Sequence, residues 1–194
     1  MIETSVPYKI NINKSFSEND LLKGLYIAVI HATRVPPHIG IIADKHYNSL
    51  TIKGQTINTS VTALVKNSVI RKIPSLFIKI KPHPTFSELY LKEHFITNVQ
   101  QFQRVDNGVA TCLSPIKLFF EEVYDVSMNN INYLYELLPK LHAEGLIEYT
   151  TALHVDENYQ LPVYSNAEIN TGIKQSQKQA IGLAFSARIS QWPI

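Results

Sequence analysis

The chain has 194 residues, of which 45% are hydrophobic and 18% charged, and this composition excludes a disordered protein. The formal net charge of +2, spread over scattered lysines, argues against a dedicated nucleic-acid surface. The single cysteine, Cys112, excludes an intrachain disulfide and a cysteine-rich zinc site, and it fits a reducing compartment.

The chain shows no sign of membrane insertion or export. Its longest apolar run, "GLYIAVIHA", is too short to span a bilayer, so we expect no membrane span. The N-terminus lacks a basic start followed by an apolar run, which is how a secretory signal begins. We therefore expect a cytoplasmic protein, and no pattern in the sequence indicates its oligomeric state.

Apolar runs bounded by turn residues predict strands in the first half of the chain. The run "LYIAVIHA" (25–32) is typical of a buried strand, and His38–Ala43 and "YNSLTIKG" (47–54) predict a hairpin beside it. The stretch "TINTSVTALVKNSVI" (56–70) fits a strand by its β-branched residues or a short helix from its second part, and we favour the helix. Alternation in "PSLFIKIKP" (74–82) predicts a further strand with one wetter face.

Helical spacing of apolar residues dominates the second half. It predicts a helix over 85–102 capped by Ser87 or Thr85, and a second one after Cys112. A third helix is predicted from residue 129, which Pro139 bends or divides before Gly145 ends it. Residues 151–170 are polar and irregular, and residues 177–192 close the chain as a helix or a strand. The predicted class is α+β, with a mainly antiparallel sheet packed with helices.

Cys112 is the strongest candidate for chemistry. Thr111 can cap a helix, and Pro115 is tolerated only in the first turn of one, so Cys112 is expected at or just before a helix N-terminus. Unpaired backbone N–H groups there favour a thiolate, which lowers the thiol pKa, and they can also hold an oxyanion. The alternative is that Cys112 is a small buried hydrophobic residue, as many free cysteines are.

A thiolate needs a base, and His38 is the histidine whose position differs from the rest. It opens a predicted strand directly after a Pro-Pro turn, and Gly40 follows on the same face, which would leave the cleft open beside the imidazole. Packing in a β-core remains the alternative for His38. No His-Glu-x-x-His motif or glycine-rich phosphate loop is present, so neither a metal nor a cofactor is predicted.

The order of these features resembles the circularly permuted papain-like group of the NlpC/P60 superfamily, which includes YiiX-like cysteine peptidases or amidases of bacteria. In that group a His-x-Gly strand precedes the helix that carries the cysteine, as "HIGI" precedes "TCLSPIKLFFEEVYDV" here. The resemblance covers residues 21–126 and implies a papain-like core there. Residues 127–194 would then form a helical and irregular C-terminal extension packed on that core, within one domain spanning 1–194.

The resemblance also implies a function. Cys112 would be the nucleophile and His38 the base, with Thr51 or Ser49 orienting the imidazole and Thr51 slightly preferred. The protein would be a thiol-dependent hydrolase or acyltransferase acting on an amide or ester bond of a small peptide, amide or acyl-ester substrate. A non-catalytic binding or scaffold protein with the same fold is the alternative. The polar segment "HVDENYQLPVYSNAEIN" (154–170) is hypothesised to run near Cys112 and restrict which acyl groups enter, and a surface loop far from the cleft is the alternative.

Overall fold

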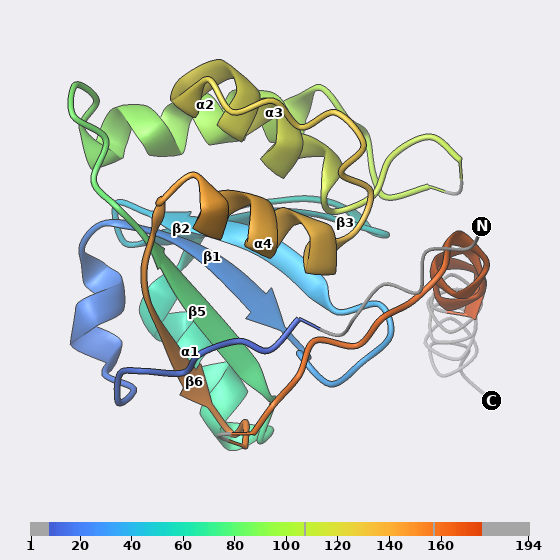
Figure 1. Ribbon diagram of the computed structural model, residues 1–194, viewed down its shortest axis with the longest axis horizontal. Coiled ribbons are helices and arrows are strands. Elements are labelled where there is room, and N and C mark those ends of the chain that lie inside the picture. The colour runs from blue at the N-terminus through green and yellow to red at the C-terminus, as the bar shows by residue number, and fades with distance from the viewer. Residues whose placement is uncertain (1–7, 107, 157, 176–194) are drawn as a thin grey trace, which may run out of the picture.

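The computed structural model of the protein describes residues 8–106, 108–156 and 158–175 (Figure 1). In chain order the elements are η1 (Glu18–Leu22), β1 (Leu25–Ile30), β2 (His38–Ala43), β3 (His46–Thr51), β4 (Gly54–Ser60), α1 (Val61–Ile70), β5 (Ser75–Ile80), α2 (Glu88–Gln100), α3 (Ser114–Tyr124), α4 (Leu134–Ala143) and β6 (Ile147–Leu153). A further helix begins at residue 166 and reaches 175, the last described residue.

The strands form one antiparallel sheet in the order β4-β3-β2-β1-β5-β6. The central strand β1 is buried along its whole length, because β2 and β5 flank it and helices cover both faces. This burial explains why its sequence is a continuous apolar run instead of an alternating one. The expected α+β class with an antiparallel sheet is confirmed.

Two layers of helices sandwich the sheet (Figure 1). The helices α2, α3 and α4 cover one face, and the main apolar cluster of the protein lies between them and the sheet. A smaller cluster on the other face joins the sheet to α1 and η1. Along β2 the side chains alternate between these faces, so Ile39 and Ile41 belong to the main cluster whereas Ile42 belongs to the smaller one.

Local sequence signals place the helices well. Ser87, one of the two predicted caps, caps α2 by accepting a hydrogen bond from the backbone N–H of Tyr90. Pro115 lies in the first turn of α3, where a missing N–H costs no hydrogen bond. The helix α4 begins at Leu134 instead of residue 129, and Pro139 lies inside it without dividing it.

Two strands differ from the sequence prediction. The stretch 56–70 was ambiguous because it contains both the end of β4 and the whole of α1, so the favoured helix is confirmed and the strand interpretation is correct for its first part. No strand was predicted between the helix end at Gly145 and the irregular region from residue 151, but residues 147–153 form β6. Gly145, with φ of 68°, ends α4, and the chain then returns to pair with β5. The predicted element 177–192 lies outside the described residues.

The extension therefore completes the sheet. The edge strand β6 pairs with β5 along its length, and Leu161 and Tyr164 are buried in the main apolar cluster. This agrees with the expectation that residues after 126 pack on the preceding part of the chain. Within the described ranges, the helices are all too short or too polar to cross a membrane.

Candidate functional site

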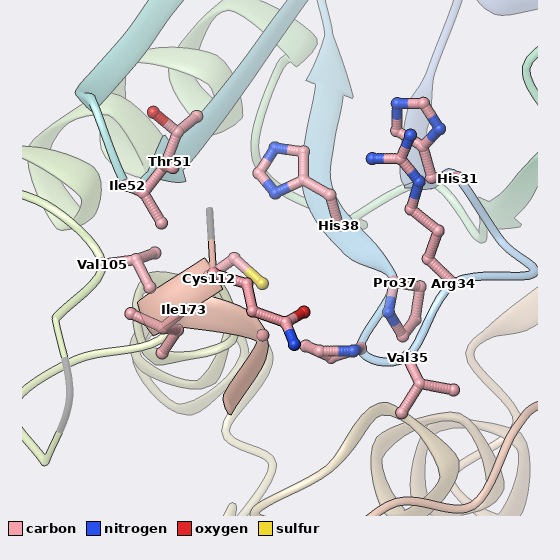
Figure 2. Close-up of a pocket in the computed structure, with 13 residues that line it drawn as sticks. His31, Arg34, Val35, Pro37, His38, Thr51, Ile52, Val105, Cys112 and Ile173 are labelled. Carbon is pink, nitrogen blue, oxygen red and sulfur yellow. The ribbon is translucent and has the colours of Figure 1, made fainter. Parts of the chain in front are cut away.

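A cavity of about 520 Å³ opens where β2 begins, and we call it the Cys112–His38 cavity (Figure 2). Segments far apart in the sequence border it: the β1–β2 turn, the end of β3, the loop before α3 and the helix 166–175. Its lining residues are His31, Arg34, Val35, Pro36, Pro37, His38, Thr51, Ile52, Val105, Cys112, Gly172, Ile173 and Gln175. The two candidate catalytic residues thus share one solvent-accessible space.

Cys112 lies two residues before α3 and is held by a tight turn. The Thr111 hydroxyl accepts a hydrogen bond from the backbone N–H of Leu113, and the Ser114 hydroxyl accepts one from the N–H of Thr111. This confirms the expected position just before a helix N-terminus. Figure 2 shows the sulfur of Cys112 directed into the cavity below the His38 ring.

The backbone of β2 reaches the Cys112 sulfur. The printed pairing of β2 and β3 runs from Ile41–Asn48 to Ala43–His46, so His38 and Ile39 lie beyond it, at the start of β2. The thiol of Cys112 lies near backbone groups of Ile39, Cys112 and Leu113 that favour its ionised form. Because Ile39 directly follows His38, this contact brings the thiol beside the first residue of the strand.

The pKa of the Cys112 thiol differs from the sequence expectation. Burial raises it above its ordinary value, and the nearby backbone groups of Ile39 and Leu113 only partly oppose that effect. The expectation of a lowered pKa is therefore wrong. A helix start favours the thiolate, but removal of water from around the sulfur has the larger effect.

His38 is the first residue of β2, and its ring is fixed from one side. Its Nε2 lies 3.2 Å from the hydroxyl oxygen of Ser49, so Nδ1 is the ring nitrogen left to face the cavity. Burial lowers the pKa of His38 to about 4, and the nearby His31 adds to that effect. His38 is consequently neutral near pH 7, and a neutral imidazole can accept a proton.

The structure brings Ser49 and not Thr51 to the imidazole. The Thr51 hydroxyl donates to the backbone oxygen of Gly54 and accepts from the N–H of Lys53, which holds the turn between β3 and β4. Both residues lie on the same face of β3, but Thr51 ends the strand and its hydroxyl is used by the turn. The slight preference for Thr51 as the partner of His38 is therefore wrong, although Thr51 lines the cavity.

Gly40 serves a different purpose from the one expected. A Cβ atom at this position would lie 2.5 Å from the backbone oxygen of Asn48 and 2.6 Å from Cε2 of Tyr47. The space beside Gly40 is filled by β3 and the Tyr47 ring, so this glycine allows the two strands to approach closely. The interpretation that Gly40 keeps a cleft open is wrong.

Sequence reasoning missed Tyr47. Its ring packs edge-on against His38 with centroids 6.5 Å apart, and its buried hydroxyl has no hydrogen-bond partner among the described residues. Burial raises the pKa of Tyr47, the neighbouring Ser49 hydroxyl opposes the rise, and Cys112 adds to it. The available signal was the strand period of two, which puts Tyr47 on the same face as Ser49.

The C-terminal part reaches the site through its helix. A smaller cavity of about 50 Å³ lies beside Cys112, and Tyr164, Ile169 and Ile173 line it. A Cβ atom on Gly172 would lie 3.1 Å from Cδ of Pro36, so the helix packs tightly on the proline turn. Tyr164 and Ile169 belong to the segment 154–170 that was hypothesised to run near Cys112, and Ile173 continues the contact along the helix.

The described residues contain no group of three or more histidines, cysteines, aspartates or glutamates that could hold a metal ion. Comparison of the chain with family models, curated proteins and solved structures gives no match. The interpretation of the site therefore depends on the geometry of Cys112, His38 and Ser49 described above.

Proposed function

We propose that the protein is a thiol-dependent hydrolase that cleaves an amide or ester bond of a small peptide, amide or acyl ester. The observation that supports this most strongly is that Cys112 and His38 line one cavity while Ser49 engages the other ring nitrogen of His38. A nucleophile, a base and a group that orients the base are the parts that thiol-dependent acyl transfer requires.

The first half of the reaction forms an acyl-enzyme. A substrate carbonyl enters the cavity beside Cys112, and neutral His38 takes the thiol proton as the sulfur attacks the carbonyl carbon. The electron pair of the C=O bond moves to oxygen, and the backbone N–H of Cys112 at the helix start is suited to stabilise that oxyanion. The bond to the leaving group then breaks, and the protonated imidazole gives its proton to the departing amine or alcohol.

The second half regenerates the enzyme. Neutral His38 takes a proton from water as the water attacks the thioester, and the acid product leaves as the thiol recovers its proton. An alcohol or amine acceptor in place of water would give acyl transfer by the same steps. The Ser49 contact matters in both halves, because it holds Nε2 and keeps Nδ1 directed towards the cavity.

The same arrangement supports the resemblance to the permuted papain-like group of the NlpC/P60 superfamily. A histidine at the start of β2 comes before a cysteine at the start of α3, which is the order that the resemblance requires. We propose that residues 21–126 carry this papain-like core. The strand β6 adds an edge to its sheet, so the core and the C-terminal part are proposed to act as one domain.

A second candidate function is a non-catalytic binding protein, and one observation favours it. Burial raises the pKa of Cys112, and the partner of His38 is a hydroxyl, which orients an imidazole less strongly than a carboxylate does. Under this candidate the cavity would bind a ligand without cleaving it.

Acyl-enzyme trapping separates the two functions. The protein would be mixed with 4-nitrophenyl acetate and examined by intact-mass and peptide mass spectrometry, with Cys112→Ala as the control. We expect an acetyl group on Cys112 that appears in a burst and then turns over. A wild-type protein that gains no acyl group on Cys112, or releases nitrophenol no faster than Cys112→Ala, would favour the binding protein.

A further inference from the structure

The Cys112–His38 cavity has a positive end. Arg34 and His31 line it beside His38, whereas Thr51, Ile52 and Val105 border the opposite side (Figure 2). In the described part of the chain, neither an aspartate nor a glutamate lines this cavity, and Arg34 forms no ion pair with a described residue. A guanidinium at a cavity wall without a protein counter-ion is available to a ligand.

A short turn holds the two basic side chains. The backbone N–H of Arg34 donates to the oxygen of His31 at 2.8 Å, and the N–H of Ala32 donates to the oxygen of Pro74 at 2.8 Å. His31 adopts φ of 56°, which is typical of a reversal of chain direction. The turn is thus fastened to β5 and carries both side chains towards the cavity.

Among the described residues that line the cavity, Arg34 is the one that carries a permanent charge. Burial, with Arg34 beside it, lowers the pKa of His31, so His31 is neutral near pH 7 and offers one N–H donor. Much of the remaining wall is apolar, with Val35, Ile52 and Ile173 among its members. A ligand that fits this surface has a short apolar part and one anionic end.

We propose that the substrate carries a carboxylate that binds Arg34, with His31 as a second donor, while its scissile carbonyl lies at Cys112. The single planar guanidinium matches the two oxygens of a carboxylate, whereas a phosphate dianion is better matched by several cations. This inference names the substrate class of the proposed hydrolase. It rests on the proposed function for the position of the carbonyl and on Arg34 for the carboxylate.

A binding experiment tests the carboxylate without requiring turnover. Glutaramate, glutaramide and methyl phosphate would be titrated into the Cys112→Ser protein by nuclear magnetic resonance. We expect glutaramate to bind about tenfold more tightly than neutral glutaramide, because a charge-assisted hydrogen bond contributes roughly that factor. The preference for glutaramate over glutaramide should disappear when Arg34→Gln is added. It should persist with Arg71→Gln, a matched change at the exposed end of α1.

A second experiment tests the carboxylate preference by measuring the hydrolysis of a matched pair of substrates. The wild-type protein would be given the 4-nitroanilides of glutarate and of glutaramate, which differ only in a terminal carboxylate or carboxamide. We expect about a tenfold lower KM for the carboxylate, lost in Arg34→Gln with kcat nearly unchanged.

The outcomes separate this inference from the proposed function. A carboxylate preference in binding without turnover of either anilide would leave the inference standing and contradict the hydrolase. Turnover with equal binding of glutaramate and glutaramide, or a preference that survives Arg34→Gln, would overturn the inference alone. Tighter binding of methyl phosphate than of glutaramate would overturn the choice of a carboxylate.

Discussion

Two histidine regions of this protein differ in a way that shows what makes a site. On the outer surface of α2 and α3, His94 lies 2.8 Å from a carboxylate oxygen of Glu122, which also accepts a hydrogen bond from Asn98. In the Cys112–His38 cavity, the hydroxyl of Ser49 is the one polar partner that the described part of the chain gives the His38 imidazole. By polar contacts alone, the surface pair is the stronger interaction.

The surroundings of the two histidines favour His38 as the functional residue, although His94 has the stronger polar contact. The imidazole of His94 contacts the carboxylate of Glu122, stacks on the ring of Tyr90 and lies tilted against Phe119. These contacts link α2 to α3. His38 lies beside a thiol at an open cavity, and burial lowers its pKa to about 4. Space and a neighbouring nucleophile distinguish the candidate site, whereas a carboxylate partner alone does not.

Removing the nucleophile should have the largest effect. We expect Cys112→Ala to reduce ester and anilide hydrolysis to background, a loss of at least about 1,000-fold, because no other thiol exists in the chain. The change removes one sulfur atom, so thermal unfolding should stay nearly cooperative and similar to wild type. The comparison between the regions breaks if hydrolysis persists in Cys112→Ala and is instead lost in Glu122→Gln.

Removing the base should have the next largest effect. We expect His38→Gln to lower kcat by about 100- to 10,000-fold, the usual contribution of a positioned general base. The matched control is His94→Gln, which should leave kcat within about twofold of wild type. Steady-state kinetics on a 4-nitroanilide measure both variants, and equal losses in the two would show that the regions do not differ in function.

Acid should destabilise the protein through His38. Its pKa is about 4 when folded and about 6.5 when unfolded, so the unfolded chain binds the proton more readily. The stability that this group contributes is complete above pH 6.5 and is lost as the pH falls towards 4. We expect urea unfolding to show that the free energy of unfolding falls by roughly 2 to 3 kcal/mol between pH 7.5 and 4.5 because of this residue. The free energy of unfolding of His38→Gln should fall by that much less over the same pH range. A pH dependence equal to that of the wild type would contradict a buried, neutral imidazole.

Removing the contact between Ser49 and His38 should have a smaller effect than removing His38 itself. We expect Ser49→Ala to lower kcat about tenfold with little change in KM, since Nε2 of His38 loses its partner. Ser49→Thr, which retains the hydroxyl, should recover part of the loss. Thr51→Val is the matched control on the same face of β3, and it should affect kcat less than Ser49→Ala. A larger effect at Thr51 would restore it as the orienting residue.

The surface pair should show the smallest effect. We expect His94→Gln to reduce the free energy of unfolding by less than about 1 kcal/mol, because the side chains of His94 and Glu122 are partly exposed and screened by water. Urea unfolding at low and high salt would measure this. A loss of several kcal/mol would mean that the pair is a structural centre and not a surface link.

The sequence by itself determined the local elements and the chemical type of the site. The apolar run of β1, the hairpin of β2 and β3 and the cap of α2 were predicted from neighbouring residues. The position of Cys112 before a helix was predicted from Pro115 without any tertiary contact. A proline is accepted in the first turn of a helix because its missing N–H would have no hydrogen-bond partner there.

Only the tertiary structure decided how these elements combine. Residues 147–153 became a strand because β5 offered a free edge, and Ser49 became the partner of His38 because the hydroxyl of Thr51 was used by its own turn. Burial by distant segments raised the pKa of Cys112 against the direction that the helix start favours. Strand pairing and desolvation depend on residues far away in the chain, so the periodicity and capping signals that identify local elements carry no information about them.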